Sequence, residues 1–220
     1  MPRLLFKKCG TAIWISHLDL MRLFQRAFKR AGLPLKHTQG FNPRPSVSIA
    51  LPLSVGTESI CELLDFELDG MELTCKEICE RLNKTLVNGV SVLDVYEGGR
   101  KIRDIMLMEC MLTLSYDHGI PAGAEEKFTN LFSQESLLVP KKTKNNGIVE
   151  QDIIPMIRQL CIRRTGEKTL ELTALICCQN PTLNPSQLTQ AIALHLPDYI
   201  PNHVACKRIE IYDKDQVIFR

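Results

Sequence analysis

The spacing of apolar side chains along this 220-residue chain constrains its fold more than any other feature. Alternation at every second residue indicates a strand, and recurrence at every third or fourth residue indicates an amphipathic helix. The first part of the chain gives strand, helix, strand, strand, helix, strand, the order of a ferredoxin-like unit with helices on one face of an antiparallel sheet. The expected elements are a strand or hairpin over 3–15, a helix over 17–31, strands over 46–51 and 58–68, a helix over 74–86 and a strand over 90–96.

The second half of the chain repeats this order more faintly, although no residue-level repeat is visible. We therefore predict an α+β protein of two tandem ferredoxin-like (βαββαβ) units with antiparallel sheets, divided into residues 1–104 and 105–220. The expected elements of the second unit are a strand over 106–116, a helix over 122–132, a polar, basic loop over 141–147, strands over 157–164 and 169–178, a helix over 185–196, a strand over 204–212 and a last piece over 216–219.

The first predicted helix has clear start and stop signals. Ser16 can cap its first turn, with Asp19 as the shorter acid of a capping box, and Gly32 ends it. At about 100° per residue, its apolar and basic side chains separate onto opposite faces. The apolar side holds Leu20, Phe24, Ala27, Phe28 and Ala31, and the basic side holds Arg22, Arg26, Lys29 and Arg30.

Positive charge is concentrated at the start of the chain. Residues 1–57 hold nine Lys/Arg against one acid, a balance of +8, whereas the other 163 residues carry 18 basic and 24 acidic residues, a balance of −6. No carboxylate occurs between Leu20 and Thr57. Such an excess in a nearly neutral chain indicates a surface that meets phosphate or another polyanion.

The segment QGFNPRP (39–45), which follows the basic helix, predicts a stiff recognition loop. Gly40 permits unusual backbone angles, and Pro43 and Pro45 hold the chain extended around Arg44. Such a loop could stack and hydrogen-bond an unpaired base, although a solvated helix face followed by a structural turn would show the same pattern. The candidate nucleic-acid or anion-binding residues are Arg22, Arg26, Lys29, Arg30, Lys36, His37, Gln39, Phe41, Asn42 and Arg44.

Catalytic signals are sparse. His17, two residues before Asp19, is a weak acid–base candidate, but a first-turn position in a capped helix explains it without chemistry. No glycine-rich phosphate loop, G-x-S-x-G or H-E-x-x-H motif occurs. We therefore predict that the chain is not an enzyme on its own, with a nuclease that uses His17 as the alternative.

Nine cysteines raise the question of a metal site. Cys75 and Cys79 could share a helix face, but no ligand follows them at a suitable spacing, and the three-cysteine pattern of radical-SAM clusters is absent. We predict buried, reduced thiols and neither a metal nor a cofactor. The acids of residues 58–69 could form a metal site, but we favour alternating positions on an exposed strand, where they could also pair with the basic segment.

The sequence gives no sign of a membrane protein. Its first residues lack the apolar stretch of a secretory signal. The uncharged run over 172–197 contains Asn, Gln and Pro residues, which hydrocarbon would not accept. We therefore expect a cytoplasmic protein.

Three stretches carry a family resemblance: ISHLDLMRLFQRAFKRAGLP, HTQGFNPRPSVSIALPLSVGTES and ELLDFEL. Together with QDIIPMIRQL and NPSQL later in the chain, they resemble the bacterial radical-SAM-linked family of uncharacterised proteins. The resemblance implies association with a radical-SAM protein, and with RNA, but it supplies no catalytic residues.

Three functions agree with these observations. The first is an accessory module that binds RNA or presents a substrate, and that works with a radical-SAM partner. The second is a metal-independent RNA endonuclease that uses His17. The third is a protein-interaction module whose basic face docks an acidic partner without RNA. We favour the first, because the basic helix and the loop after it can follow successive phosphates.

Overall fold

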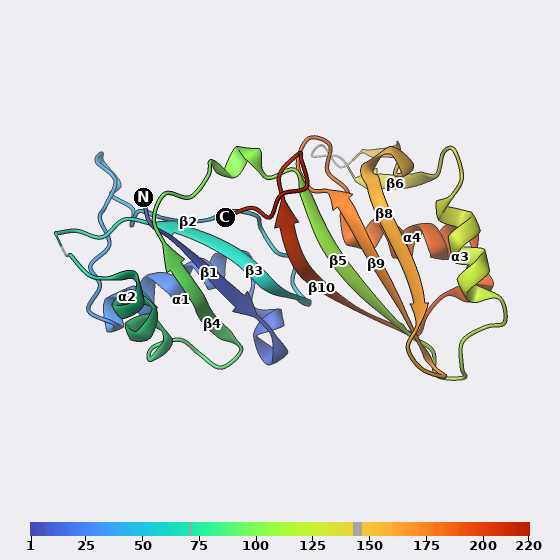
Figure 1. Ribbon diagram of the computed structural model, residues 1–220, viewed down its shortest axis with the longest axis horizontal. Coiled ribbons are helices and arrows are strands. Elements are labelled where there is room, and N and C mark those ends of the chain that lie inside the picture. The colour runs from blue at the N-terminus through green and yellow to red at the C-terminus, as the bar shows by residue number, and fades with distance from the viewer. Residues whose placement is uncertain (71, 143–146) are drawn as a thin grey trace. The chain divides into compact units, whose positions relative to one another are not determined.

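The computed structural model describes residues 1–70, 72–142 and 147–220, and it has a mixed α+β architecture (Figure 1). Its described residues divide into two compact units, Met1–Ile102 with Arg220 and Arg103–Phe219. They contain four α-helices, and every helix among them falls short of the length and apolar character needed to cross a bilayer.

The first unit has the predicted element order. Its strands lie in the order β4–β1–β3–β2, and each pair of neighbours is antiparallel. The bounds are β1 (Arg3–Lys8), α1 (His17–Arg30), β2 (Val47–Ile49), β3 (Thr57–Phe66), α2 (Cys75–Asn83) and β4 (Val90–Tyr96), with a short 3-10 helix, η1 (Gly10–Trp14).

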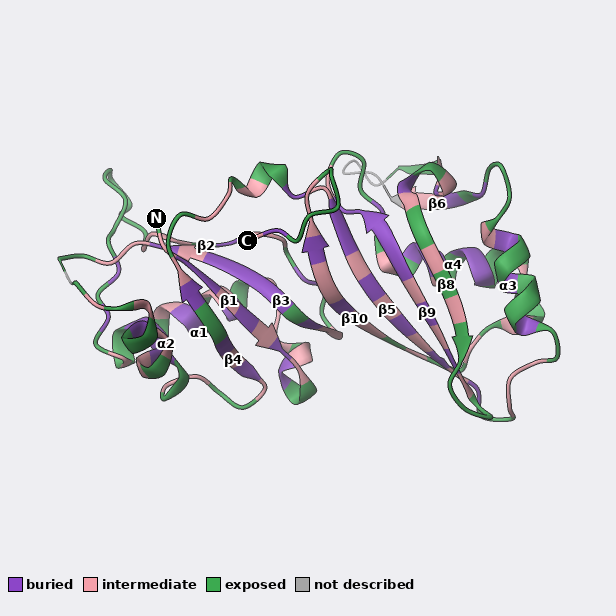
Figure 2. Cartoon of the chain, viewed as in Figure 1, coloured by how far each residue is buried: buried purple, intermediate pink, exposed green. Residues whose placement is uncertain are grey.

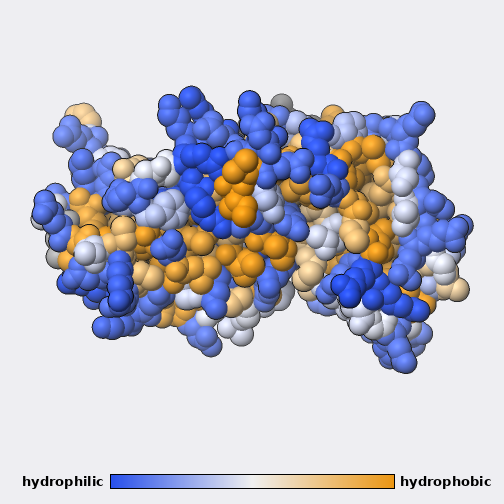
Figure 3. Space-filling model, viewed as in Figure 1, coloured by the Kyte–Doolittle hydropathy of each residue, from blue (hydrophilic) through white to orange (hydrophobic). Residues whose placement is uncertain are grey.

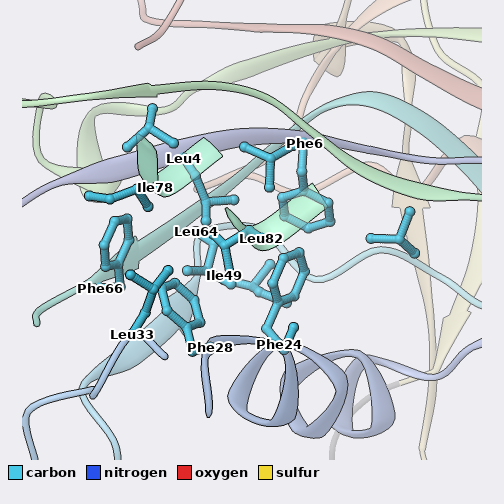
Figure 4. Close-up of a cluster of buried hydrophobic side chains, with 14 of the residues drawn as sticks. Leu4, Phe6, Phe24, Phe28, Leu33, Ile49, Leu64, Phe66, Ile78 and Leu82 are labelled. Carbon is cyan, nitrogen blue, oxygen red and sulfur yellow. The ribbon is translucent and has the colours of Figure 1, made fainter. Parts of the chain in front are cut away.

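Aromatic side chains join α1 to the sheet of this unit. Phe24 packs edge-on against Phe6 of β1, with 4.8 Å between the ring centroids, and Phe28 lies 5.0 Å from Phe66 of β3. Figure 4 shows both phenylalanines pointing from α1 toward the strands. Because all four rings are fully buried, the apolar stripe of the helix is fixed to the sheet and its basic side is left in solvent.

The segment between β1 and α1 differs from the prediction. A strand or hairpin over 3–15 is wrong beyond Lys8, because residues 10–14 form η1. Gly10 has a φ of +57°, which turns the chain out of the strand. The buried ammonium of Lys8 then donates to the carbonyls of Ile13 (3.1 Å) and Ile15 (2.8 Å), so these groups are satisfied without a strand partner.

The second unit has the same strand arrangement. Its sheet runs β10–β5–β9–β8 with antiparallel neighbours, and two helices supply apolar side chains to its core (Figure 2). The bounds are β5 (Leu107–Ser115), α3 (Ala124–Phe132), β6 (Leu138–Lys142), β7 (Ile148–Asp152), β8 (Ile157–Arg164), β9 (Thr169–Cys177), α4 (Pro185–His195) and β10 (His203–Tyr212), with short 3-10 helices η2 (Ile102–Asp104), η3 (Ile154–Met156) and η4 (Pro197–Tyr199).

An additional hairpin interrupts the predicted order of the second unit. Strands β6 and β7 pair with each other, so the loop expected over 141–147 is wrong for Lys141 and Lys142, which belong to β6. Residues 143–146 of that loop lie outside the described residues. Most of β7 is exposed, and its sequence therefore lacks the alternation that marks a half-buried strand.

Candidate nucleic-acid interface

Helix α1 presents its basic side chains to solvent. Ser16 caps the helix, since its hydroxyl accepts from the backbone N–H of Asp19 (3.2 Å), and Leu20, Phe24, Ala27 and Phe28 are buried on the other side. The side chains of Arg22, Arg26, Lys29 and Arg30 are all exposed. The predicted amphipathic helix is confirmed, and we call these four residues the basic face.

The basic face also contains an acid. Asp19 lies on it, and its carboxylate accepts from the Arg22 guanidinium at 3.0 Å. The expected capping box is incomplete: the short Asp19 side chain accepts from the Ser16 hydroxyl (2.7 Å) instead of the Ser16 backbone N–H. Hydrogen bonds from Ser16 and Arg22 lower the pKa of Asp19, so the carboxylate is charged at neutral pH and offsets one cation.

The members of the basic face differ in how they are held. Arg30 donates to the carbonyl of Thr85 at 2.8 Å, and Arg22 is paired with Asp19. Arg26 and Lys29 make no hydrogen bond or ion pair to any residue that the structure describes. These two cations are therefore available to an anionic ligand without losing an internal contact.

Two hollows flank the basic face. The first, of about 580 Å³, has apolar walls from the turn after α1 and from Pro45, and Arg26, Lys29 and His37 at its polar positions. The second, of about 450 Å³, lies on the other side of the helix. Its lining residues are Ile15, Asp19, Arg22, Leu23, Arg26, Arg30 and Val87. Arg26 lines both hollows and therefore stands between them.

The loop after α1, residues 36–46, is narrow because backbone hydrogen bonds join its two sides. The backbone N–H of Ser46 donates to the carbonyl of Lys36 at 2.7 Å. Nearer the tip, the N–H of Thr38 donates to the carbonyl of Arg44 at 2.8 Å, while its hydroxyl accepts from the Arg44 N–H at 3.0 Å. At the tip, Gly40 has a φ of +138° and the Phe41 ring is fully exposed. The loop therefore carries an aromatic surface into solvent.

The structure brings only part of the predicted site together. Arg26, Lys29 and His37 line the first hollow, and Arg22 and Arg30 line the second with Arg26. Lys36 is turned to an ion pair with Glu67 at 3.4 Å. The remaining predicted residues are exposed in the loop and line neither hollow: Gln39, Phe41, Asn42 and Arg44.

Sequence reasoning missed two exposed apolar residues close to the start of α1. Trp14 is 69% exposed at the end of η1, and Leu18 is 67% exposed in the first turn of α1. At helical spacing, Leu18 lies one turn before Arg22 on the solvent side. An apolar side chain on an otherwise charged helix face was the available signal.

His17 is the first residue of α1 and half-buried. No described residue makes a hydrogen bond or ion pair to its imidazole, so the structure gives it neither an orienting carboxylate nor a second catalytic group. The first-turn position proposed for it is confirmed.

The prediction of buried thiols holds for Cys61, Cys110, Cys177 and Cys178, but it is wrong for Cys161, which is exposed. Among the described residues, no group of three or more His, Cys, Asp or Glu side chains could hold a metal ion. Cys75 and Cys79 are half-buried on α2 and pack against the core of the first unit. Of the acids of residues 58–69, Asp65 pairs with Arg3, and Glu67 with Lys36 of the basic segment. The expected exposed strand position is wrong for Glu62, which is buried.

Hydrophobic side chains are also partly exposed on the strands of the first unit. Leu5 of β1 is half-buried and Leu93 of β4 is 46% exposed. In the space-filling view, orange hydrophobic residues gather over the region of β1 and β3 (Figure 3).

A family model now places the chain among known sequences. The model described as "Uncharacterized protein conserved in bacteria (DUF2344)" matches residues 2–185. The chain belongs to this family. Its description names neither a partner nor an activity. No curated protein matches the DUF2344 chain.

A comparison with solved structures shows similarity in fold to one neighbour with a TM-score above 0.5. A chain from the crystal structure of a Cbf5-Nop10-Gar1 complex is 7% identical with a TM-score of 0.52, and the match covers 96% of this DUF2344 chain and 48% of that one. The chain thus spans about half the length of this neighbour. An unknown protein from Galdieria sulphuraria is 9% identical over 94% of this chain and 96% of that one, with a TM-score of 0.26.

Proposed function

We propose that this protein is an accessory module that binds single-stranded RNA through the basic face of α1, and that it catalyses no reaction by itself. The observation that carries the proposal is the pair of exposed, uncommitted cations, Arg26 and Lys29, set above apolar hollows. Phosphates supply the charge that such cations attract, and unpaired bases supply flat apolar surfaces.

Helix geometry supports a nucleic-acid strand as the ligand. Arg22, Arg26 and Arg30 follow one another at intervals of four residues, about 6 Å along the helix axis. A guanidinium fork can bind a phosphate with two parallel hydrogen bonds. A row of such groups therefore suits a ligand with regularly repeated phosphates.

The loop tip adds a sequence-tolerant contact. The exposed Phe41 ring could stack on a base, with Arg44 available to a phosphate. Gln39 and Asn42 could hydrogen-bond the edges of the same base. On this proposal, α1 supplies most of the affinity, and the loop selects unpaired over paired RNA.

The strand order and antiparallel pairing of each unit support two tandem ferredoxin-like domains, divided near residue 104. We propose that the module works in the cytoplasm beside a radical-SAM protein, which would supply the chemistry that this chain lacks. RNA cleavage by His17 is the less favoured function, since no second catalytic group among the described residues orients its ring.

A specific observation favours one alternative. Trp14 and Leu18 are exposed near the basic face, and an acidic, amphipathic protein segment would use both features. Such a partner, including an acidic surface of a radical-SAM protein, would bind with a similar dependence on salt. Separate titrations with RNA and with the partner protein distinguish the two functions.

The test of RNA binding measures the affinity for a labelled single-stranded RNA, by fluorescence anisotropy, at a series of salt concentrations. Each phosphate contact contributes a slope of about −0.7 to log K against log salt, so the double variant R26Q/K29Q should flatten the slope by about 1.4. The matched control is R163Q/R164Q, which removes two exposed cations from β8. Equal slopes for the wild type and R26Q/K29Q would show that α1 is not part of the RNA-binding surface.

A further inference from the structure

We propose that the two hollows receive two successive unpaired bases of one strand, and that Arg26 binds the phosphate between them. The inference rests on the proposed RNA binding and adds the kind of RNA that the site accepts. It requires a flexible single strand with two adjacent bases free to turn toward the protein. A duplex keeps its bases stacked and paired, so it would leave both hollows empty.

The first hollow suits a base in its apolar part. Its walls include Leu33, Leu35 and two proline rings, Pro34 and Pro45. Proline rings and aliphatic side chains can cover a planar base without requiring a particular hydrogen bond, since every base has two flat faces. The volume, about 580 Å³, is in the usual range of small-ligand sites.

Cations stand where the phosphate of that nucleotide would lie. Arg26 and Lys29 line the hollow, and His37 lines it from the far side of the turn. Because the side chains of Arg26 and Lys29 are exposed and make no hydrogen bond or ion pair with the described residues, they can move to the phosphate without breaking such a bond. The hollow therefore combines an apolar wall with a cationic rim.

The second hollow repeats this combination on the other side of α1. Ile15, Leu23 and Val87 provide its apolar part, and Val87 is 44% exposed. Arg22, Arg26 and Arg30 provide the cations. One acid, Asp19, also lines it, but its charge is offset by the pair with Arg22. The balance of this hollow thus remains positive.

Arg26 connects the two hollows into one site. It is the residue common to both linings, and it lies one helical turn from Arg22 and one from Arg30. An RNA strand that crosses α1 at Arg26 would place one base on each side of the helix. Its connecting phosphate would then meet the Arg26 guanidinium, which can hold two phosphate oxygens at once.

The experiment compares two short single-stranded RNAs of equal length and charge, one complete and one with two adjacent abasic nucleotides. With wild-type protein, we expect the abasic RNA to bind at least about 30-fold more weakly, because stacking of both bases is lost. The slope against salt should be unchanged, because the phosphates are the same. Equal affinities for the two RNAs would overturn the two-base site.

Filling a hollow gives a second measurement. Gln25→Trp would place an indole in the first hollow and Val87→Trp in the second, whereas Asn130→Trp adds an indole to an exposed position of α3 as the matched control. Each filled hollow should reduce the preference for complete over abasic RNA, and the control should keep it. A full preference in both filled variants would also overturn the proposal.

The outcomes separate this inference from the function on which it rests. Salt-dependent binding without a preference for complete RNA would leave the RNA-binding function standing and remove the two-base site. Binding without salt dependence would contradict both. If an acidic peptide of equal charge binds as tightly as the complete RNA, the occupant of the hollows is a protein segment, which also contradicts the two-base site.

Discussion

At the scale of single residues, Ser16 and His17 are neighbours with different expected roles. The Ser16 hydroxyl accepts the backbone N–H of Asp19, whereas the His17 ring has no partner among the described residues. Ser16→Ala should lower the free energy of unfolding by about 0.5–2 kcal/mol, because a capping oxygen is lost. His17→Ala should change it little, and both values can be measured by urea denaturation.

The same pair distinguishes a binding module from a nuclease. Purified protein should not cleave RNA, and His17→Ala should bind RNA as the wild type does. If His17 moves a proton, its removal would lower a cleavage rate by about 10²–10⁴ at nearly unchanged affinity. Metal-independent cleavage that disappears in His17→Ala would make the protein an enzyme.

Asp19 gives the basic face a dependence on pH. Its pKa is lowered in the folded protein by Ser16 and Arg22, so the stability that it contributes is present above its unfolded pKa of about 3.9 and is lost as the pH falls through the folded value. Asp19→Asn should therefore lose less stability than the wild type on acidification. The effect should be small because the carboxylate is exposed. Circular dichroism during an acid titration measures the unfolding of both proteins.

At the scale of elements, the sheet contact of α1 determines where the basic face points. Phe24 and Phe28 are fully buried against β1 and β3. Phe24→Ala should lower the free energy of unfolding by about 3–5 kcal/mol through the lost contacts and the cavity. Leu18→Ala, on the exposed side of the same helix, should stay within about 0.5 kcal/mol of the wild type, and similar losses in both variants would contradict the packing.

The elements that sequence predicted well are those with one buried and one exposed face. Helix α1 and strands such as β4 have a clear period, and their ends carry capping or turn residues. The 3-10 helix after Lys8 was missed because Gly10 also fits the turn of a hairpin, and because the sequence does not show that the buried Lys8 ammonium binds the carbonyls of Ile13 and Ile15. Hairpin β6–β7 was missed because its exposed residues do not alternate.

Prediction of the candidate site had a similar limit. The basic residues were visible because charge along one helix face can be counted in the sequence. The hollows were not, because Val87 and Pro45 reach α1 from loops distant in the chain. Ion pairs such as Lys36 with Glu67 also depend on which strand lies beside which loop, so sequence alone could not assign these charges to partners.

At the scale of the whole molecule, thiol reactivity tests burial of Cys61 in the first unit and of Cys110, Cys177 and Cys178 in the second. Burial raises the pKa of Cys110 and of Cys178 to about 12, so both stay protonated at pH 8, whereas Cys161 is exposed. Iodoacetamide should label Cys161 first in the folded protein, and the buried cysteines only after unfolding. Mass spectrometry of labelled peptides measures this, and early labelling of Cys110 would contradict the described core.

Lys8 has a consequence for how the whole protein would receive a ligand. Its ammonium ties the two carbonyls before α1 to the end of β1, so the helix is anchored to the sheet at the point where the basic face begins. An RNA strand would then bind to a surface of the protein that is already folded. Calorimetry should accordingly show a modest heat-capacity change on association, set by the area covered on contact, in contrast to the large change of a segment that orders as it binds.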